Sequence, residues 1–381
     1  MEENAMLTQP HSEELNIKEK LIIIAALCGE ISYDLPSRLG ATSNYERHVR
    51  YLLYKEDYLR HSKENDIKSL FITGNGFERL SKDNPSRYKY VDTKIRTEPA
   101  RRYRRRLFGY TYCSLFNSDI EFLPDKKPYI FSRSRDDPYV TQPYPLLLQN
   151  RLSSDPVFYS SVEIKYELED NVQQIRNSAM LGLILTDKDR YVLYNAHDCQ
   201  YPMSYATELK VSLMTSNGTF IQNKKDTAAI VLVSDMINAA ALVIGNKDLN
   251  ITPSMIIMNE AYKHIYLVPE TEDGDTQLQV LCHEDLRDMI DITFEENFGK
   301  PNPSFSIVND GFDEDNNPVL NCCHLDIIRL MRFKRGLLVN DLTGRILCYD
   351  FQMEFIRKVM KPAKIEINHI KIKDVKEMIV T

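Results

Sequence analysis

A proline-rich stretch before the middle of the chain limits how the whole chain can fold. Six prolines fall between residues 124 and 156, and proline breaks helices and is excluded from central strands. Residues 124–158 are therefore expected to be ordered but without long helices or strands. The stretch separates a front part with helical spacing from a rear part in which strands and helices alternate, which predicts more than one domain in 381 residues.

The front part carries signals for three helices, a hairpin and a fourth helix. Capping boxes are expected at the starts of the first and third helices, Asn16 with Glu19 and Ser43 with Glu46. Two apolar runs around a polar Asn-Asp tip predict a hairpin over 58–72. Thr73 is expected to cap the next helix, with Gly74 and Gly76 allowing a tight entry. This order is typical of a winged helix-turn-helix domain, here over residues 16–83, after a flexible start at 1–15.

Basic residues concentrate in this part of the chain. Residues 38–106 hold 18 lysines and arginines against nine acidic residues, a local charge of +9 that leaves −16 for the rest of a chain whose net charge is −7. A basic block on an otherwise acidic chain is typical of a protein that binds a polyanion. Double-stranded DNA is therefore the expected partner.

The third expected helix, residues 43–56, is the one that would enter the major groove. Its apolar positions repeat at helical spacing, and the opposite side carries Asn44, Arg47, His48, Tyr51 and Lys55. Asn44 and Arg47 are the expected base-edge contacts. Phosphate contacts are expected from basic residues of the helix and hairpin, namely Arg50, Lys55, Arg60, His61, Lys63 and Lys68. The simpler alternative is a solvated helix face.

A connector is expected over residues 84–157, beginning with a basic helix. The run ARRYRRR at 100–106 follows Pro99, and proline is favoured in the first turn of a helix. One interpretation is an arm along the DNA backbone, with phosphate contacts from Arg101, Arg102, Arg104 and Arg105. The alternative is a helix start that makes salt bridges to the acidic rear part.

The rear part, residues 158–381, is expected to form a mixed-sheet α/β domain. Its pattern predicts hairpins over 180–195 and 336–351, further strands within 229–235, 254–260, 264–270 and 363–370, and helices over 283–297 and 352–360. Because a hairpin requires an antiparallel pair, the sheet should combine parallel and antiparallel strands.

The segment VEIKYELE, residues 162–169, is the one candidate for catalysis. If it is extended, Glu163 and Lys165 share a face, as in the acid-x-Lys element of restriction-type nucleases. That chemistry needs a second carboxylate to hold Mg²⁺, and the preceding acids, Asp136, Asp137 and Asp155, do not end a recognisable strand. Alternatively, Ser160 or Ser161 caps a helical turn with Glu163 in its first turn.

Other chemistry lacks a sequence signal. There is no phosphate-loop motif, no nucleophile elbow and no histidine pair at metal spacing. The seven cysteines are scattered without a CxxC pair, so no metal site and no cofactor are expected, and the thiols suit a reducing cytoplasm. No apolar run reaches the roughly 18 residues of a membrane span, so no membrane partner is expected.

Several segments resemble the replication-relaxation-like proteins of plasmids and conjugative or mobilisable elements of low-GC Gram-positive bacteria. They are KLIIIAALCGEISYDLPSRLGATSNYERHVRYLLYKEDYLR, FITGNGFERL, FYSSVEIK, MLGLILTDKDRYVLYNAHD and LLVNDLTGRILCYDFQMEF. The resemblance implies an N-terminal winged helix and a C-terminal domain of nuclease-like architecture that often lacks catalytic residues. The family's winged-helix positions correspond to Asn44, Arg47, His48 and Tyr51, and no catalytic residue carries over.

These observations together predict a cytoplasmic, non-enzymatic DNA-binding accessory protein of a mobile genetic element. The resemblance implies a role in replication or in processing the relaxase-bound origin, with a relaxase or replication protein as partner. Self-association into a homodimer is a further expectation. The alternatives are a winged-helix transcriptional regulator and a restriction-type, metal-dependent nuclease.

Overall fold

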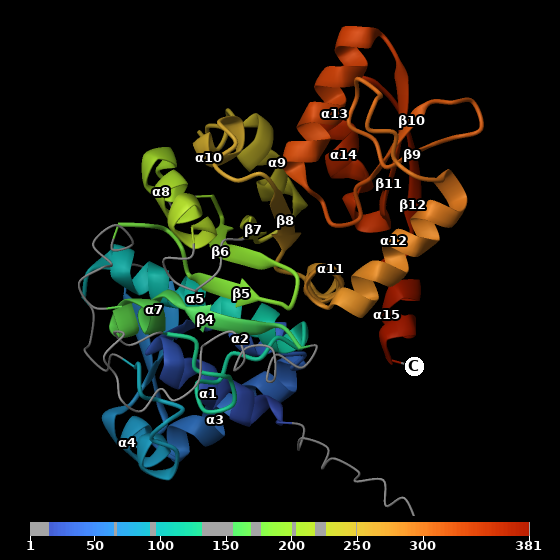
Figure 1. Cartoon of the computed structure of the whole chain (residues 1–381). Coiled ribbons are helices and arrows are strands. Elements are labelled where there is room, and N and C mark those ends of the chain that lie inside the picture. The colour runs from blue at the N-terminus through green and yellow to red at the C-terminus, as the bar shows by residue number, and fades with distance from the viewer. Residues whose placement is uncertain are drawn as a thin grey trace, which may run out of the picture.

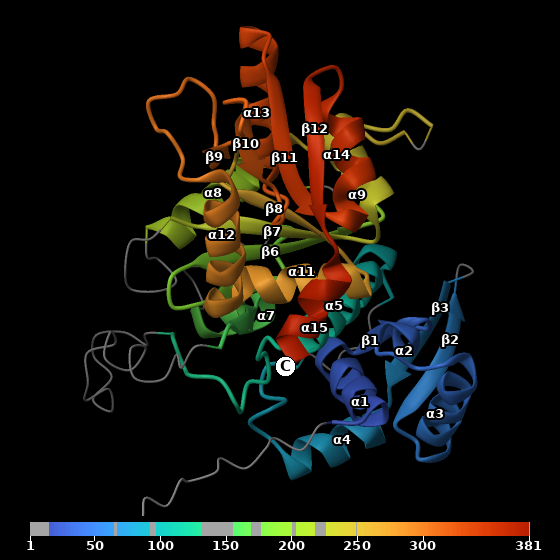
Figure 2. The same ribbon diagram turned by 90° about the vertical axis from the view of Figure 1, so that its right-hand side faces the viewer.

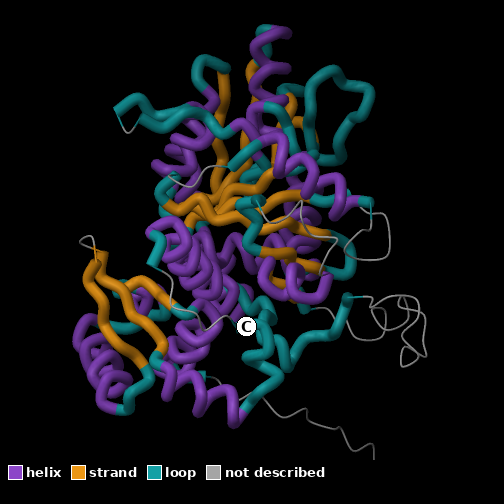
Figure 3. Tube along the Cα trace, turned by 90° about the vertical axis from the view of Figure 1, so that its left-hand side faces the viewer, coloured by secondary structure: helices purple, strands orange, loops and turns teal. Residues whose placement is uncertain are grey.

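The structure, a computed structural model, describes residues 15–64, 67–91, 97–131, 155–168, 177–199, 203–217, 226–248 and 250–380, without the side chains of residues 63, 64, 67 and 380. Residues 1–14 of the flexible start expected over 1–15 lie outside these ranges, as do most of the proline-rich stretch, Asp136 and Asp137. The expected mixed α/β fold is confirmed as helices packed on three separate sheets (Figures 1 and 3). Within the described ranges, every helix is too short or too polar to cross a bilayer.

The first sheet belongs to a front unit of four helices and three strands. Its elements are α1 (Ile17–Cys28), β1 (Glu30–Ser32), α2 (Leu35–Arg38), α3 (Ser43–Lys55), β2 (Leu59–Glu64), β3 (Ile67–Ile72) and α4 (Gly74–Asp83). The strands lie in the order β1-β3-β2, and both pairs are antiparallel. The hairpin expected from the sequence is therefore present, and β1 is a third strand that the sequence did not indicate.

Local signals at the helix starts are partly confirmed. Asn16 and Glu19 form the expected capping box of α1, and the side chain of Thr73 accepts a hydrogen bond from the Gly76 amide at the start of α4. The box expected at Ser43 is wrong: α3 already begins at that residue, and its cap makes no side-chain hydrogen bond. Glu46 instead pairs with Arg50 one turn later, at 3.1 Å.

The second sheet is the centre of the molecule. Its strands are β4 (Val157–Ser160), β5 (Gly182–Leu185), β6 (Arg190–His197), β7 (Ala228–Val233) and β8 (Ile265–Pro269), paired in that order. The β4-β5-β6 pairs are antiparallel and the β6-β7-β8 pairs are parallel, so the expected mixed sheet and the expected β5-β6 hairpin are both confirmed. One face packs against α8 (Tyr205–Ser216), α9 (Met236–Ile244) and α10 (Met255–Met258).

The third sheet lies at the far end from the front unit (Figures 1 and 2). It comprises β9 (Gly311–Phe312), β10 (Pro318–Asn321), β11 (Thr343–Tyr349) and β12 (Lys364–Ile370), in the order β12-β11-β10-β9. One face packs against α13 (Ile327–Asn340) and α14 (Met353–Met360), which follows the short η2 (Asp350–Gln352). The other face packs against α12 (Glu284–Phe298) and α15 (Ile372–Val380).

The helix α5 (Pro99–Asn117) joins the front unit to the central sheet. It starts at the expected proline and lies with α11 (Glu272–Cys282) on the face of the central sheet opposite α8 to α10. One continuous hydrophobic core contains residues of α1, α3, β3, α5, all five central strands and α11, among them Leu21, Leu53, Leu107, Ile184 and Leu278. This core therefore includes residues on both sides of the boundaries expected near residues 83 and 158.

Two expected secondary structures are wrong, and a third segment adopts the second of its two expected forms. Residues 254–260 were expected as a strand, but they contain the short helix α10. The second expected hairpin, over 336–351, is instead the end of α13 followed by β11. The segment 162–169, for which an extended acid-x-Lys element and a helical turn were both open, is the helix α7 (Ser161–Leu168). In the first two cases an apolar run that suits a strand also suits a buried helix, so periodicity alone did not distinguish them.

Candidate nucleic-acid interface

The outer face of α3 presents a continuous row of polar side chains. Val49 and Leu53 point into the core and are almost fully buried, because they lie one helical turn apart on the inner side. The residues on the opposite side are solvent-exposed and follow the i, i+3, i+4, i+7, i+11 spacing of one helix face: Asn44, Arg47, His48, Tyr51 and Lys55. Tyr51, with 60% of its surface exposed, is an unusually open aromatic residue.

Tyr33 fixes the position of this helix relative to the hairpin. The Arg50 guanidinium lies 4.1 Å from the centre of the Tyr33 ring and donates a 3.1 Å hydrogen bond to the Tyr33 carbonyl oxygen. The same arginine pairs with Glu46 and is buried. The expected phosphate contact from Arg50 is therefore wrong, because its guanidinium is used inside the unit. Tyr33 itself had no signal in the sequence beyond being an aromatic residue between two short elements.

The hairpin places further basic groups beside α3. The His61 ring meets the Tyr33 ring edge-on at 5.6 Å, and the Lys68 ammonium lies 5.9 Å from the centre of the same ring. Arg60 is exposed, with Asp57 3.8 Å away. Lys63 pairs in register with Lys68 across the β2-β3 hairpin, but its side chain is outside the described part. The hairpin thus places His61 and the exposed Lys68 against the same Tyr33 ring that contacts Arg50 of α3.

The hairpin and α4 meet at a tight junction. The Thr73 hydroxyl donates to the Asp57 carbonyl and accepts from the Gly76 amide at 2.9 Å. A β-carbon on Gly76 would lie 2.8 Å from the Tyr58 Cα, so the close approach of α4 to the chain before β2 requires glycine here. Arg79 of α4 donates to the Glu56 carbonyl at 3.1 Å and adds an exposed positive charge that the sequence analysis did not select.

The arginines of α5 do not form an arm along the surface. Arg102 is buried and makes hydrogen bonds of 2.9–3.2 Å to Glu30, a carboxylate with no exposed surface. Arg104 is partly buried and donates to the carbonyl oxygens of Ser178 and Met180. The expected phosphate contacts from these two arginines are wrong, because both side chains connect α5 to other parts of the interior.

The other two arginines lie closer to solvent. Arg101 is exposed and pairs with Glu98 at 3.1 Å across one helical turn. Arg105 is partly buried, and its guanidinium lies against Gly29 at the end of α1. Arg101 is thus the member of the run whose exposure is compatible with a phosphate contact. Neither expected interpretation describes the run as a whole, because its buried ion pair joins Arg102 to Glu30 of the front unit and not to DNA or to the acidic rear part.

The candidate catalytic pair is also rearranged. Glu163 and Ser160 form a capping box at the start of α7, with hydrogen bonds of 2.9 and 3.2 Å. Glu163 also pairs at 2.6 Å with Lys127, and burial lowers the pKa of that lysine despite the carboxylate. Lys165 follows two positions later on the helix, a spacing that puts two side chains on different faces. The helical alternative is thus confirmed, and the nuclease element is wrong.

Metal ligands do not converge elsewhere in the described ranges, where no group of three or more histidines, cysteines, aspartates or glutamates is arranged to hold an ion. Across the described residues, all seven cysteines are free thiols, and six of them are buried. The exposed face of α3 with the neighbouring hairpin is therefore the candidate site that the geometry supports best.

Comparison with known proteins adds no relative, since no protein-family model, no curated protein and no solved structure matches this chain significantly.

Proposed function

We propose that this protein binds double-stranded DNA through a winged helix formed by residues 17–83. The order of elements supports this proposal: three helices, a hairpin whose second strand, β3, pairs with the short β1, and a closing helix. In such a domain α3 lies in the major groove and the β2-β3 hairpin lies along the backbone. The single observation that carries the proposal is the exposed polar row on α3 beside the basic hairpin.

The exposed side chains divide into two roles. Asn44 and Arg47 are at the N-terminal half of α3, and asparagine and arginine are the side chains that pair bidentately with adenine and guanine edges. His48 and Tyr51 extend the same face. Lys55 at the end of α3 and the exposed Arg60 and Lys68 of the hairpin suit phosphate contacts, which position a protein without reading sequence. A phosphate contact from Lys63 stays a prediction, because its side chain is outside the described part.

The biological setting follows from the sequence resemblance. We infer an accessory protein of a mobile genetic element, without catalytic activity of its own, that assists a replication protein or a relaxase at the element's origin. The central and third sheets would provide the surface for that partner or for a second copy of the chain. A cytoplasmic location and the nuclease-like architecture of the rear part remain predictions of the same resemblance.

A transcriptional regulator is the second candidate function. A cavity between α1, α5 and α7 favours it, because a ligand bound there would contact both the front unit and the segment after the central β4 strand. The two candidates predict different partners. Stimulation of origin nicking by a purified relaxase supports the accessory role, whereas repression of its own promoter without any effect on nicking supports the regulator.

The DNA-binding proposal is tested with the full-length protein, because the front unit shares its core with the central sheet. Fluorescence anisotropy should show binding to random duplexes at low salt, and selection from a random library should yield a preferred site. Alanine at Asn44, Arg47 and His48 together should abolish that preference. Arg357 is an exposed arginine on α14, distant from α3, and Arg357→Ala serves as the matched control. Absence of duplex binding at low salt by the folded wild-type protein would refute the proposal.

A further inference from the structure

The two faces of the third sheet carry opposite charge. The helices α13 and α14 cover one face, and residues 327–364, which contain both, hold nine lysines and arginines against three acidic residues, a net charge of +6. The helix α12 lies on the other face (Figure 2), and residues 284–298 hold six acidic residues against one arginine, a net charge of −5. One layer of the molecule is therefore basic on one side and acidic on the other.

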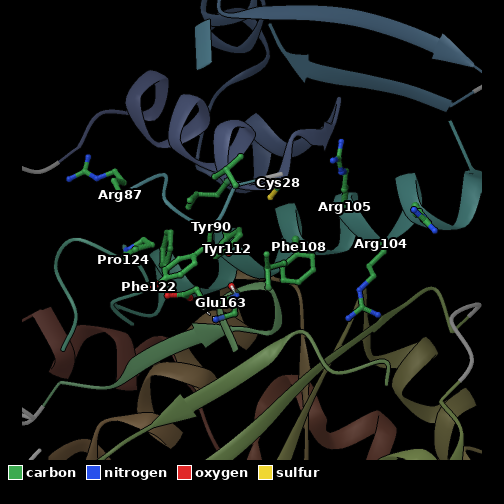
Figure 4. Close-up of a pocket in the computed structure, with 15 residues that line it drawn as sticks. Cys28, Arg87, Tyr90, Arg104, Arg105, Phe108, Tyr112, Phe122, Pro124 and Glu163 are labelled. Carbon is green, nitrogen blue, oxygen red and sulfur yellow. Dashed lines mark hydrogen bonds between the residues drawn. The ribbon is translucent and has the colours of Figure 1, made fainter. Parts of the chain in front are cut away.

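Three cations on the α13–α14 side are available for contacts with another molecule. Arg335, Lys358 and Lys361 are exposed and make no hydrogen bond or ion pair with any other described residue. The arginines around the cavity in Figure 4 differ in this respect, since Arg104, for example, donates to two backbone carbonyl oxygens. The basic side of the third sheet thus carries charge that the described chain does not use internally.

Side-chain contacts join α13 to the neighbouring helix. The Lys334 ammonium of α13 donates a 2.7 Å hydrogen bond to the carbonyl oxygen of Val359, near the end of α14. Arg335 and Lys358 directly follow and precede these two residues in the sequence. The available cations of the two helices therefore lie on neighbouring parts of one surface. Beside them, Val339 is 78% exposed and follows Arg335 by one helical turn.

The acidic helix α12 presents a matching row. Asp285 and Glu296 are exposed, and neither makes a hydrogen bond or ion pair within the part of the chain that the structure describes. They lie seven positions before and four positions after Ile292, a spacing that puts the three side chains on one helix face, and Ile292 is 57% exposed. Asp288 of the same helix is by contrast already paired with Lys188, at 3.2 Å.

We propose that copies of this chain associate head to tail, with α12 of one copy against α13 and α14 of the next. The occupant of the basic face is a second copy because the chain itself carries the complementary pattern, two acids around an exposed isoleucine for cations beside an exposed valine. Two different faces meet at such a contact, so each copy keeps one face open and the association continues into a ring or a filament. The proposal specifies how a second copy would contact the third sheet, and it does not depend on DNA binding by the front unit.

Sedimentation velocity of the full-length protein at several concentrations tests the association. At roughly 0.05 M salt, the sedimentation coefficient should rise with concentration beyond that of a dimer, because exposed charges then interact over more than about 10 Å. At about 1 M salt the screening length falls to about 3 Å, and the monomer should predominate. A protein that stays monomeric at low salt, or a dimer that high salt leaves intact, would overturn the proposal.

Two charge-reversed variants identify the faces that meet. The basic-face variant carries Arg335→Glu and Lys358→Glu, and the acidic-face variant carries Asp285→Lys and Glu296→Lys. Each variant alone should associate at least about tenfold more weakly than the wild type, because like charges then meet at the contact. An equimolar mixture of the two should associate again, since every contact between the two variants pairs opposite charges.

The double variant Lys82→Glu with Lys126→Glu is the matched control. Both lysines are exposed and lie outside the third sheet, and the substitutions change the net charge as much as those of the basic-face variant. The control should keep the wild-type association within about twofold. Circular dichroism verifies that all variants fold. Folded variants whose mixture stays monomeric, or a control that loses association as strongly as the basic-face variant, would show that these two faces do not meet.

Discussion

Glu30 and Arg102 form a buried ion pair that joins β1 to α5 across 72 residues of sequence. The Arg102 Nε lies 3.0 Å from Oε2 of Glu30, and Nη2 lies 2.9 Å from Oε1. Arg106, one turn later on α5, contributes a further contact of 3.2 Å to Oε1. A single carboxylate thus faces two guanidiniums inside the protein, and it links the front unit to the helix that packs on the central sheet.

Glu30→Gln should therefore destabilise the whole protein. Removing one partner of a buried ion pair leaves the other charge without compensation, which costs about 3–5 kcal/mol, and here two arginines lose their carboxylate. Urea unfolding followed by circular dichroism measures the change in the free energy of unfolding. Glu98→Gln is the matched control, because the Glu98–Arg101 pair at the start of the same helix is about 60% exposed and should contribute about 1 kcal/mol or less. Equal losses in both variants would contradict a special role for the buried pair.

The arginine run shows what sequence reasoning could and could not predict. The helix and its start at Pro99 were predictable from the proline and the spacing of apolar residues. The partners of the arginines were not predictable, because Glu30 is distant in sequence and carries no local signal. A run of arginines indicates charge density, but which of them face solvent depends on tertiary packing. The sequence consequently predicted phosphate contacts for Arg102 and Arg104, whereas in the structure Arg102 is buried and Arg104 is partly buried.

The elements of the fold also include some that the sequence predicted correctly and some that it did not. Elements with strong local signals were predicted correctly, such as the β5-β6 hairpin around Asp187–Asp189 and the Thr73 cap of α4. The hairpin predicted over 336–351 is wrong because the helix α13 continues through Gly336, the residue at which the hairpin was expected to begin, as far as Asn340. For α3, helical periodicity correctly predicted the exposed row on the outer side, but Tyr45, which the same spacing places on the inner side, is 39% exposed. It could not show that Arg50 turns back to Tyr33.

Base-edge and phosphate contacts should be separable by their salt dependence. Arg47→Ala should cost about 1–3 kcal/mol on the selected DNA site and should weaken binding to unrelated duplexes much less, because it removes a base-edge contact. Lys68→Ala should weaken binding to all duplexes alike and lower the salt slope by about 1, because it removes one phosphate contact. Affinities measured by fluorescence anisotropy at several salt concentrations give both quantities. If Arg47→Ala weakens binding to all duplexes equally, Arg47 contacts a phosphate and not a base edge.

Gly76 and Gly74 should respond differently to a methyl group. Gly76→Ala brings a β-carbon to 2.8 Å from the Tyr58 Cα and 2.9 Å from its carbonyl oxygen, and both are backbone atoms that move only with β2. The expected loss is about 1–3 kcal/mol. Gly74 has no atom within 4 Å of the same position, so Gly74→Ala should be neutral or stabilise α4 by up to about 1 kcal/mol. Thermal unfolding compares the two variants, and a larger loss at Gly74 would contradict the close packing of α4 on Tyr58.

His197 should make stability depend on pH in the neutral to alkaline range. It ends β6, its Nδ1 lies 2.5 Å from Oε2 of Glu270, and its ring stacks on Tyr110 of α5 at 4.5 Å. Burial opposes its protonation, but the hydrogen bond and charge of Glu270, with the nearby Asp198 and Asp34, raise the pKa of His197 above its usual value. A raised pKa means that the folded state binds the proton more tightly than the unfolded chain.

The stabilisation from His197 is therefore complete below the unfolded pKa of about 6.5 and is lost as pH rises through the folded pKa. Urea unfolding from pH 6 upward should show the wild-type free energy of unfolding falling with pH, and His197→Gln should flatten that slope. His324 affects stability in the acidic range instead, because burial lowers its pKa to about 4. Its effect on the free energy of unfolding is therefore a loss of stability that begins only as pH falls below about 6.5. An unchanged slope in His197→Gln would assign the alkaline dependence to another group.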